Sequence, residues 1–190
     1  MKKLLLAVPI IALGLAGLAH ATAQRHAAAA PAPMLLSAAD FSYLQTIPVA
    51  HGAGAAFGCP GKNTPLTLSW TNVPPGTKSL ALTMVDYTVP FPPGFFVHWI
   101  VYDIPPTFSG IDPSSLGSVS QGINGAGLVG YFGPCPPPIP PQPHVYTLEL
   151  FALNTVLPQQ RTTLHTLQEE MKQHMLAVAP FAGTFGNPPQ

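Results

Sequence analysis

Alternating apolar and polar positions dominate the middle of this chain and predict β-strands. Three alternating runs, 79–87, 95–104 and 144–153, are bounded by clusters of proline and glycine, and a shorter run covers 65–70. Strands do not alternate with helical segments, so a parallel doubly wound sheet is not expected. The pattern predicts a mainly β protein in which two antiparallel sheets pack face to face.

A different period appears near the C-terminus and predicts one helix. Apolar residues recur there at spacings of three and four: Leu164, Leu167, Met171, Met175 and Val178. We expect an amphipathic helix from about Thr163 to Ala179, capped by Thr162 or Thr163 and ended by Pro180. We interpret its apolar stripe as a surface packed against a sheet. The fold class is therefore a two-sheet β structure with this C-terminal helix and short peripheral helices.

The N-terminal pattern predicts export. Two lysines precede an uncharged apolar run over 4–19, and Ala-x-Ala sequences follow it. This layout is typical of a secretory signal peptide, here residues 1–23, with cleavage after Ala21 or Ala23. The run is shorter than the roughly 20 residues of a spanning helix, so we expect no stable membrane anchor after cleavage. The predicted location is periplasmic or secreted.

Composition bounds the remainder of the chain. Residues 24–34 are small, contain proline and lack periodicity, which predicts a disordered lead-in, and 35–190 fit a single domain. Charged residues make up 7% of the chain and the formal net charge is zero, so a nucleic-acid partner is not expected. Cys59 and Cys135 are predicted to form one disulfide in an oxidising compartment. The alternative is that Cys135 is a free nucleophile.

Polar groups interrupt the apolar faces of the three long predicted strands. Because side chains alternate along a strand, Asp86 ends the apolar row of its strand, and His144 and Tyr146 begin the row of theirs. By the same alternation, His98 shares a face with Phe96, Ile100 and Tyr102. If these faces meet, the groups converge at one end of the sandwich in a pocket for a small ligand.

The donors in such a pocket favour an anion. Imidazole and phenol groups supply N–H and O–H donors, and backbone amides at Gly130 and Gly133 can approach an oxyanion such as phosphate. Asp86 either orients a histidine or meets a cationic group on the ligand. Prolines in 134–143 restrict the backbone just before His144. They can equally form a docking surface for a protein partner.

Enzyme motifs are missing from the sequence. It contains no Gly-x-Ser-x-Gly, His-Glu-x-x-His, Gly-Lys phosphate loop or Cys-x-x-Cys pattern. The remaining histidines have no spacing typical of metal ligands. We therefore expect no catalysis, no metal site and no cofactor.

Several motifs, in order and spacing over about 40–186, resemble the phosphatidylethanolamine-binding protein family, also called Raf kinase inhibitor-like proteins, and in particular its bacterial YbhB/YbcL branch. They are "NTP" (63–65), "VPPGTKSLALTMVD" (73–86), "HW" (98–99), "DIP" (103–105), "GYFGPCPP" (130–137), "HVY" (144–146), "ALN" (152–154) and "AGTFG" (182–186). The resemblance implies a two-sheet β fold with a small anion pocket.

The family's pocket residues correspond to six positions here: Asp86, His98, Gly133, Pro134, His144 and Tyr146. Three positions depart from the family pattern. Tyr87 stands in place of a proline, Thr88 in place of a second acid and Val145 in place of an arginine.

Together with the predicted signal peptide, the resemblance implies an exported, non-catalytic protein that binds a small anion, such as phosphate or a phosphoethanolamine-type phospholipid headgroup, and acts as an inhibitor-like regulator. The alternative is an interaction module, similar to a protease or kinase inhibitor, that acts through the proline-rich loop and keeps only a vestigial ligand pocket.

Overall fold

The computed structural model describes residues 32–139, 142–158 and 162–186, and these contain two antiparallel sheets. The smaller sheet has the order β1-β2-β5, with bounds β1 Leu35–Ala38, β2 Leu68–Thr71 and β5 Gly110–Ile111. The larger sheet has the order β6-β4-β3-β7-β8, with bounds β6 Ser120–Gln121, β4 Phe96–Ile104, β3 Ser79–Asp86, β7 His144–Leu153 and β8 Met175–Phe185. The predicted fold class is confirmed.

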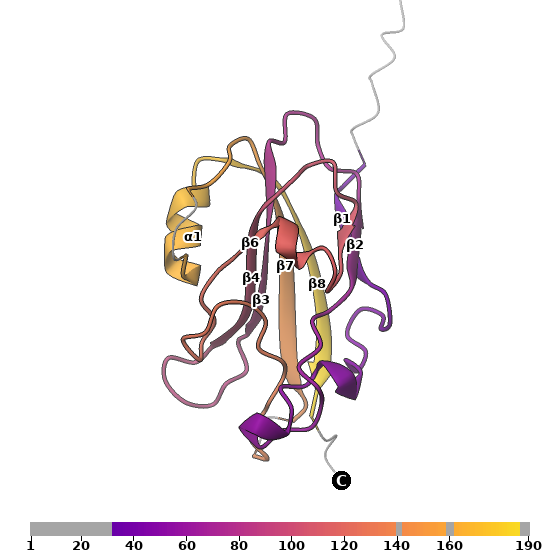
Figure 1. The fold of residues 1–190 in the computed structure, drawn as a ribbon, viewed down its shortest axis with the longest axis vertical. Coiled ribbons are helices and arrows are strands. Elements are labelled where there is room, and N and C mark those ends of the chain that lie inside the picture. Colours follow the sequence, from indigo (N-terminus) through magenta and orange to yellow (C-terminus); the bar gives the residue numbers. More distant parts are fainter. Residues whose placement is uncertain (1–31, 140–141, 159–161, 187–190) are drawn as a thin grey trace, which may run out of the picture. The chain divides into compact units, whose positions relative to one another are not determined.

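Both faces of the larger sheet are covered. One face packs against the smaller sheet around a core that includes Leu82, Trp99 and Leu148. On the opposite face, α1 (Leu164–Met171) encloses a second apolar cluster, and Figure 1 shows the helix and β1 on opposite sides of the large sheet. Every residue of the central strand β3 is buried as a result.

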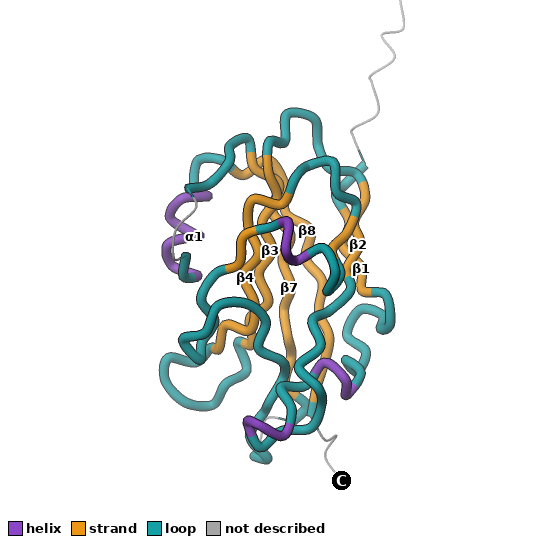
Figure 2. The backbone as a smooth tube through the Cα atoms, in the orientation of Figure 1, coloured by secondary structure: helices purple, strands orange, loops and turns teal. Residues whose placement is uncertain are grey.

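The long strands lie where alternation predicts them. β3, β4 and β7 match the three predicted runs to within one residue at each end, and β2 overlaps the shorter run. β1, β5 and β6 were not predicted, because segments of two to four residues carry too little periodicity to recognise. Short 3₁₀ helices η1 Val49–His51, η2 Ala55–Phe57 and η3 Leu116–Ser118 interrupt the loops (Figure 2).

The predicted C-terminal helix is half wrong. Thr163 does cap α1, since its hydroxyl accepts a hydrogen bond from the Thr166 amide at 3.2 Å. The helix ends at Met171, however, and the predicted second half, from Met175 onward, is the start of β8. Residues 175–179 pair with β7 instead. Hydrogen bonding to this neighbouring strand overrides the helical spacing of the apolar residues.

The N-terminal predictions fall mostly outside the described residues, since the structure describes nothing before residue 32. Met34, assigned from sequence to the lead-in, is buried in the core between the sheets, so packed structure begins by this residue. Within the described part of the chain, no helix is long and apolar enough to cross a membrane.

Candidate functional site

The four polar side chains singled out in the sequence lie on three neighbouring strands of the larger sheet. β3 is bonded to β4 on one side and β7 on the other, and Asp86 at the end of β3 lies opposite both Phe96 and Tyr146. His144, Tyr146, Asp86 and His98 are 0%, 0%, 2% and 4% exposed. They gather at one end of a single sheet, and each is enclosed by protein.

A β-bulge in β4 corrects the face assigned to His98. The pairing shifts between Met84 opposite Trp99 and Val85 opposite Val97, which leaves His98 as the extra residue. Beyond the bulge, Trp99 faces the core between the sheets, whereas Ile100 packs in the cluster beneath α1. Strict alternation predicts that His98 shares a face with Ile100 and Tyr102. This prediction is wrong, because a bulge reverses the alternation of the residues that follow it.

The centre of the site is a buried pair of Asp86 and His144. His144 Nδ1 lies 2.6 Å from Asp86 Oδ2, and Nδ1–H donates to the carboxylate. Asp86 Oδ1 accepts from the Thr88 amide at 2.7 Å and from the Thr88 hydroxyl. The Thr88 hydroxyl in turn accepts from the Val145 amide at 3.2 Å. Of the two possible roles for Asp86, the structure shows the orientation of a histidine.

His98 holds the loop that covers the site. Its Nδ1 lies 2.7 Å from the carbonyl of Phe132, and its ring meets that of Tyr146 at 4.9 Å between centroids. Burial lowers the pKa of His98 to about 4, so the imidazole is neutral at neutral pH. A neutral imidazole has one N–H, and here it donates to a carbonyl, so His98 has no N–H left for a ligand.

Two buried polar atoms of the site have no hydrogen-bond partner: His144 Nε2 and Tyr146 Oη. The two side chains project from the same face of β7, two residues apart. Burial and the neighbouring Asp86 charge raise the pKa of Tyr146, so its hydroxyl stays protonated and can donate. The Cys135 backbone opposes this rise in pKa as a hydrogen-bond donor would, but its contact with Tyr146 Oη does not have the geometry of a hydrogen bond.

The glycine amides do not have the role expected of them. The Gly133 amide donates to Asn63 Oδ1 at 2.8 Å, and the Gly130 amide donates to the Gly122 carbonyl at 3.0 Å, so neither is free for an oxyanion. Gly133 instead permits close packing, because a Cβ there would collide with the carbonyl of His51. The next residue, Pro134, lies in the same buried loop, and its carbonyl accepts from Ala53 at 3.0 Å.

A disulfide secures this loop. Cys135 is joined to Cys59, with a Cα–Cα distance of 5.6 Å, as the sequence predicts. The bond links the loop that covers His98 to the segment that follows η2. Both segments lie at the end of the molecule where β7 begins (Figure 2).

Sequence reasoning missed supporting residues around the site. Asn63 accepts from the loop at Gly133, and its only signal was its place in the "NTP" motif. His51, seen in the sequence as part of a glycine-rich loop, is buried and bonds Asp40 Oδ2 at 2.8 Å and the Thr64 carbonyl at 2.7 Å. Within the described residues, no group of three or more His, Cys, Asp or Glu side chains could hold a metal ion.

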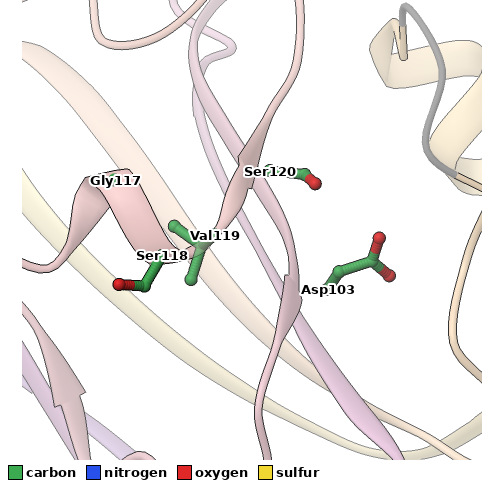
Figure 3. Close-up of a pocket in the computed structure, with 5 residues that line it drawn as sticks. All are labelled: Asp103, Gly117, Ser118, Val119 and Ser120. Carbon is green, nitrogen blue, oxygen red and sulfur yellow. The ribbon is translucent and has the colours of Figure 1, made fainter.

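A hollow lies elsewhere on the large sheet. Asp103 of β4 and residues 117–120 line a cavity of about 250 Å³ (Figure 3). Asp103 Oδ1 accepts from the Leu157 amide at 2.9 Å, and burial raises the pKa of this carboxyl. None of the predicted site residues lines this cavity, so we regard the Asp86–His144 pair as the candidate site.

Known proteins resemble this chain over the same region. The family model for phosphatidylethanolamine-binding proteins matches residues 37–186. A UPF0098 protein of Chlamydia muridarum is 36% identical over 156 residues, which cover 80% of this chain and 98% of the relative.

Solved structures agree with this match. The phosphatidylethanolamine-binding protein homologue CT736 from Chlamydia trachomatis superposes with a TM-score of 0.74 at 34% identity, covering 82% of this chain and 99% of that one. Escherichia coli YbcL, described as a member of the mammalian family, gives a TM-score of 0.73 at 26% identity, covering 83% and 100%. The chain therefore belongs to the phosphatidylethanolamine-binding protein family.

Proposed function

We propose that the protein is an exported, non-catalytic member of this family that binds a small phosphate-type anion at His144 and Tyr146. The observation that carries the proposal is the pair of buried, unpartnered atoms His144 Nε2 and Tyr146 Oη on one face of β7. A buried polar atom without a partner costs about 1–3 kcal/mol. A ligand oxygen that bonds both atoms removes this cost.

The chemistry of the two groups supports an oxyanion. Tyr146 offers a neutral O–H donor, and Asp86 fixes the His144 ring so that Nε2 faces away from the carboxylate. With Nδ1–H donating to Asp86, Nε2 can accept from a protonated phosphate oxygen. An inhibitor-like regulatory role follows the family resemblance and is part of this proposal.

The nucleophiles near the site support binding without catalysis. The Thr88 hydroxyl is bonded to Asp86 and to the Val145 amide, and Cys135 is in a disulfide. Covalent catalysis needs a nucleophile next to a base that can take its proton. In the described part of the site, the Thr88 hydroxyl is instead engaged in hydrogen bonds and the Cys135 sulfur in a disulfide.

Export is supported by the N-terminal pattern of 1–23 and by the disulfide, a bond typical of oxidising compartments. Intact-mass measurement of the protein recovered from the periplasm or medium tests this part of the proposal. We expect a chain that begins at Thr22 or Gln24. Full-length protein retained in the cytoplasm would contradict export.

Binding is tested by adding inorganic phosphate to the purified mature protein and following the histidine side-chain resonances by NMR. We expect His144 and His98 to shift together, since the His98 ring packs against Tyr146 and His144 projects from the same face of β7 as Tyr146, while His165 on α1 stays unchanged. The variant His144→Ala should lose the His98 response. No shift at millimolar phosphate would overturn the proposed anion site.

One observation favours a second function, protein docking through the proline-rich loop. Ile139 is 43% exposed in a loop anchored by the Cys135 disulfide and by bonds from Gln142 to the carbonyls of Pro137 and Ile139. Replacing 136–139 with a Gly/Ser sequence tests it. Capture of a protein partner should fall while phosphate binding persists, and unchanged capture would count against docking.

A further inference from the structure

His51 has an oxygen acceptor at each of its two ring nitrogens. Its Nδ1 lies 2.7 Å from the Thr64 carbonyl oxygen, and its Nε2 lies 2.8 Å from Asp40 Oδ2. A carbonyl only accepts, and an aspartate carboxylate accepts unless it is protonated, which ordinarily takes a pH of about 4 or lower. A neutral imidazole has one N–H and would direct the lone pair of its other nitrogen at an oxygen. Both bonds form only when the ring is an imidazolium, with a hydrogen on each nitrogen.

The surroundings of His51 suit a charged ring. The residue is 6% exposed, and a buried charge is stable only when it is paired and hydrogen-bonded. The Asp40 carboxylate supplies the opposite charge. The Asp40 side chain is 44% exposed, so a proton can pass between the pair and water.

The other groups around this segment add no competing charge. The Tyr131 hydroxyl donates to the His51 carbonyl at 3.1 Å, and burial together with the Asp40 charge raises the pKa of Tyr131, so the phenol stays neutral. The Lys62 side chain, from the neighbouring loop, is exposed. From β8, the apolar ring of Phe185 lies where a Cβ on Gly52 would meet it.

Residues 51–53 support the loop that covers the candidate site, residues 131–134, here called the site loop. The Ala53 amide donates to the Pro134 carbonyl at 3.0 Å, and the His51 carbonyl accepts from Tyr131 Oη. Gly133 packs so closely there that an added Cβ would lie 2.1 Å from the His51 carbonyl oxygen. A displacement of His51 is therefore transmitted directly to the site loop.

We propose that His51 is a proton-operated latch for the site loop. As an imidazolium it ties 51–53 to Asp40 on one side and to Thr64 on the other. Loss of its proton as the pH rises breaks one of these bonds, because the nitrogen without a hydrogen then faces an oxygen acceptor, and the site loop opens more often. The latch is present at the lower pH and lost at the higher one, and it is independent of what the site binds.

The first measurement is the protonation state of the His51 ring in the wild-type mature protein, by NMR of its two ring nitrogens. At about pH 7.5 an exposed imidazole is mostly neutral, since its ordinary pKa is about 6.5. We expect both nitrogens of His51 to carry a hydrogen at this pH and one of them to lose it at a higher pH. A neutral His51 ring at the first pH would overturn the proposal.

Amide hydrogen exchange measures the hold on the site loop. The Ala53 amide bonds the Pro134 carbonyl and the Gly133 amide bonds Asn63 Oδ1. Protection factors at these two amides should fall by about tenfold as His51 loses its proton, the size of one charge-assisted hydrogen bond. The Leu167 amide on α1 is the control and should keep its protection.

Two carboxylate variants provide a matched pair. Asp40→Asn places an amide beside Nε2, and this amide can donate to a neutral ring, so the bonds of His51 no longer require a charge. In this variant His51 should be neutral at about pH 7.5 and the protection of the site loop should no longer depend on pH. Asp112→Asn should behave as wild type, since Asp112 bonds serines of its own turn.

Two further results would contradict the latch. One is unchanged protection of Ala53 and Gly133 while His51 loses its proton. The other is a loss of protection with pH that persists in Asp40→Asn, because another group would then be titrating. The ring and amide measurements on the wild-type protein decide the matter even if Asp40→Asn does not fold.

Discussion

At the scale of single residues, hydrogen bonding rather than burial distinguishes the groups of the candidate site. His98 and His144 lie on the two strands that flank β3 and are both enclosed, yet their bonds differ. His98 donates to a backbone carbonyl, whereas His144 donates to a carboxylate and keeps an unpartnered Nε2. The sequence could assign both histidines to the site. Only the contacts in the structure show that His144 Nε2 has no hydrogen-bond partner.

The buried neutral state of His98 predicts acid sensitivity. Its folded pKa of about 4 is below the ordinary value of 6.5, so the unfolded chain binds more protons between these values. Its contribution to stability is complete above about pH 6.5 and is lost as the pH falls toward 4. We expect about 2 kcal/mol less free energy of unfolding at pH 5 than at pH 7 from this group.

Denaturant unfolding of wild type and His98→Gln at the two pH values measures this effect. The glutamine keeps a donor for the Phe132 carbonyl but does not titrate. The variant should therefore show the smaller loss between pH 7 and pH 5. Equal losses in the two proteins would contradict the assignment.

At the scale of elements, the C-terminal region shows how a local pattern and a neighbouring strand compete. The apolar spacing continues past Met171, but the chain turns at 172–174 and pairs with β7 from Met175 onward. His174 Nδ1 bonds Asn154 Oδ1 at 2.8 Å, and the Asn154 amide donates to the His174 carbonyl, which secures this turn to the end of β7.

The short helix depends on its cap. Thr163→Ala removes the acceptor for the Thr166 amide and should lower the free energy of unfolding by about 1 kcal/mol. Thr163→Ser keeps an acceptor oxygen and should be close to wild type. Both values come from chemical denaturation, and an unchanged Thr163→Ala variant would show that this cap does not stabilise the fold.

The disulfide joins two elements that are 76 residues apart in sequence. Reduction, or the double change Cys59→Ser and Cys135→Ser, should lower the free energy of unfolding by about 2–4 kcal/mol, because the unfolded chain is then less restricted. Thermal denaturation with and without reductant measures the loss. A reductant effect that persists in the double variant would contradict its origin in this bond.

At the scale of the whole molecule, the site loop is held against segments that are distant in sequence. Gly133 packs so closely on 51–53 that an added Cβ would meet three backbone atoms there. Gly133→Ala should therefore lower the free energy of unfolding by about 2 kcal/mol or more. Gly117→Ala is the control, since no atom lies within 4 Å of its added Cβ.

Thermal unfolding of the two variants makes the comparison. If Gly133→Ala unfolds at the same temperature as Gly117→Ala, the close packing of the loop is not needed for stability.

The sequence by itself determined the fold class and the long strands, and it singled out the polar residues of the candidate site. Alternation specifies β3, β4 and β7 because the spacing of large apolar side chains is a local property of the residues. The resemblance to the family placed Asp86, His98, His144 and Tyr146 in one site, and the structure brings these four together.

Tertiary structure decided the rest. The bulge at His98, the strand that replaces the second half of the predicted helix and the occupied amide of Gly133 all depend on partners far away in the sequence. The role of Thr88 is of the same kind, because its hydroxyl joins two strands whose alignment comes only from the assembled sheet. Hydrogen-bond partners depend on this alignment and could not be predicted from the sequence. The spacing of apolar and polar residues depends only on the sequence, and the long strands could therefore be predicted from it.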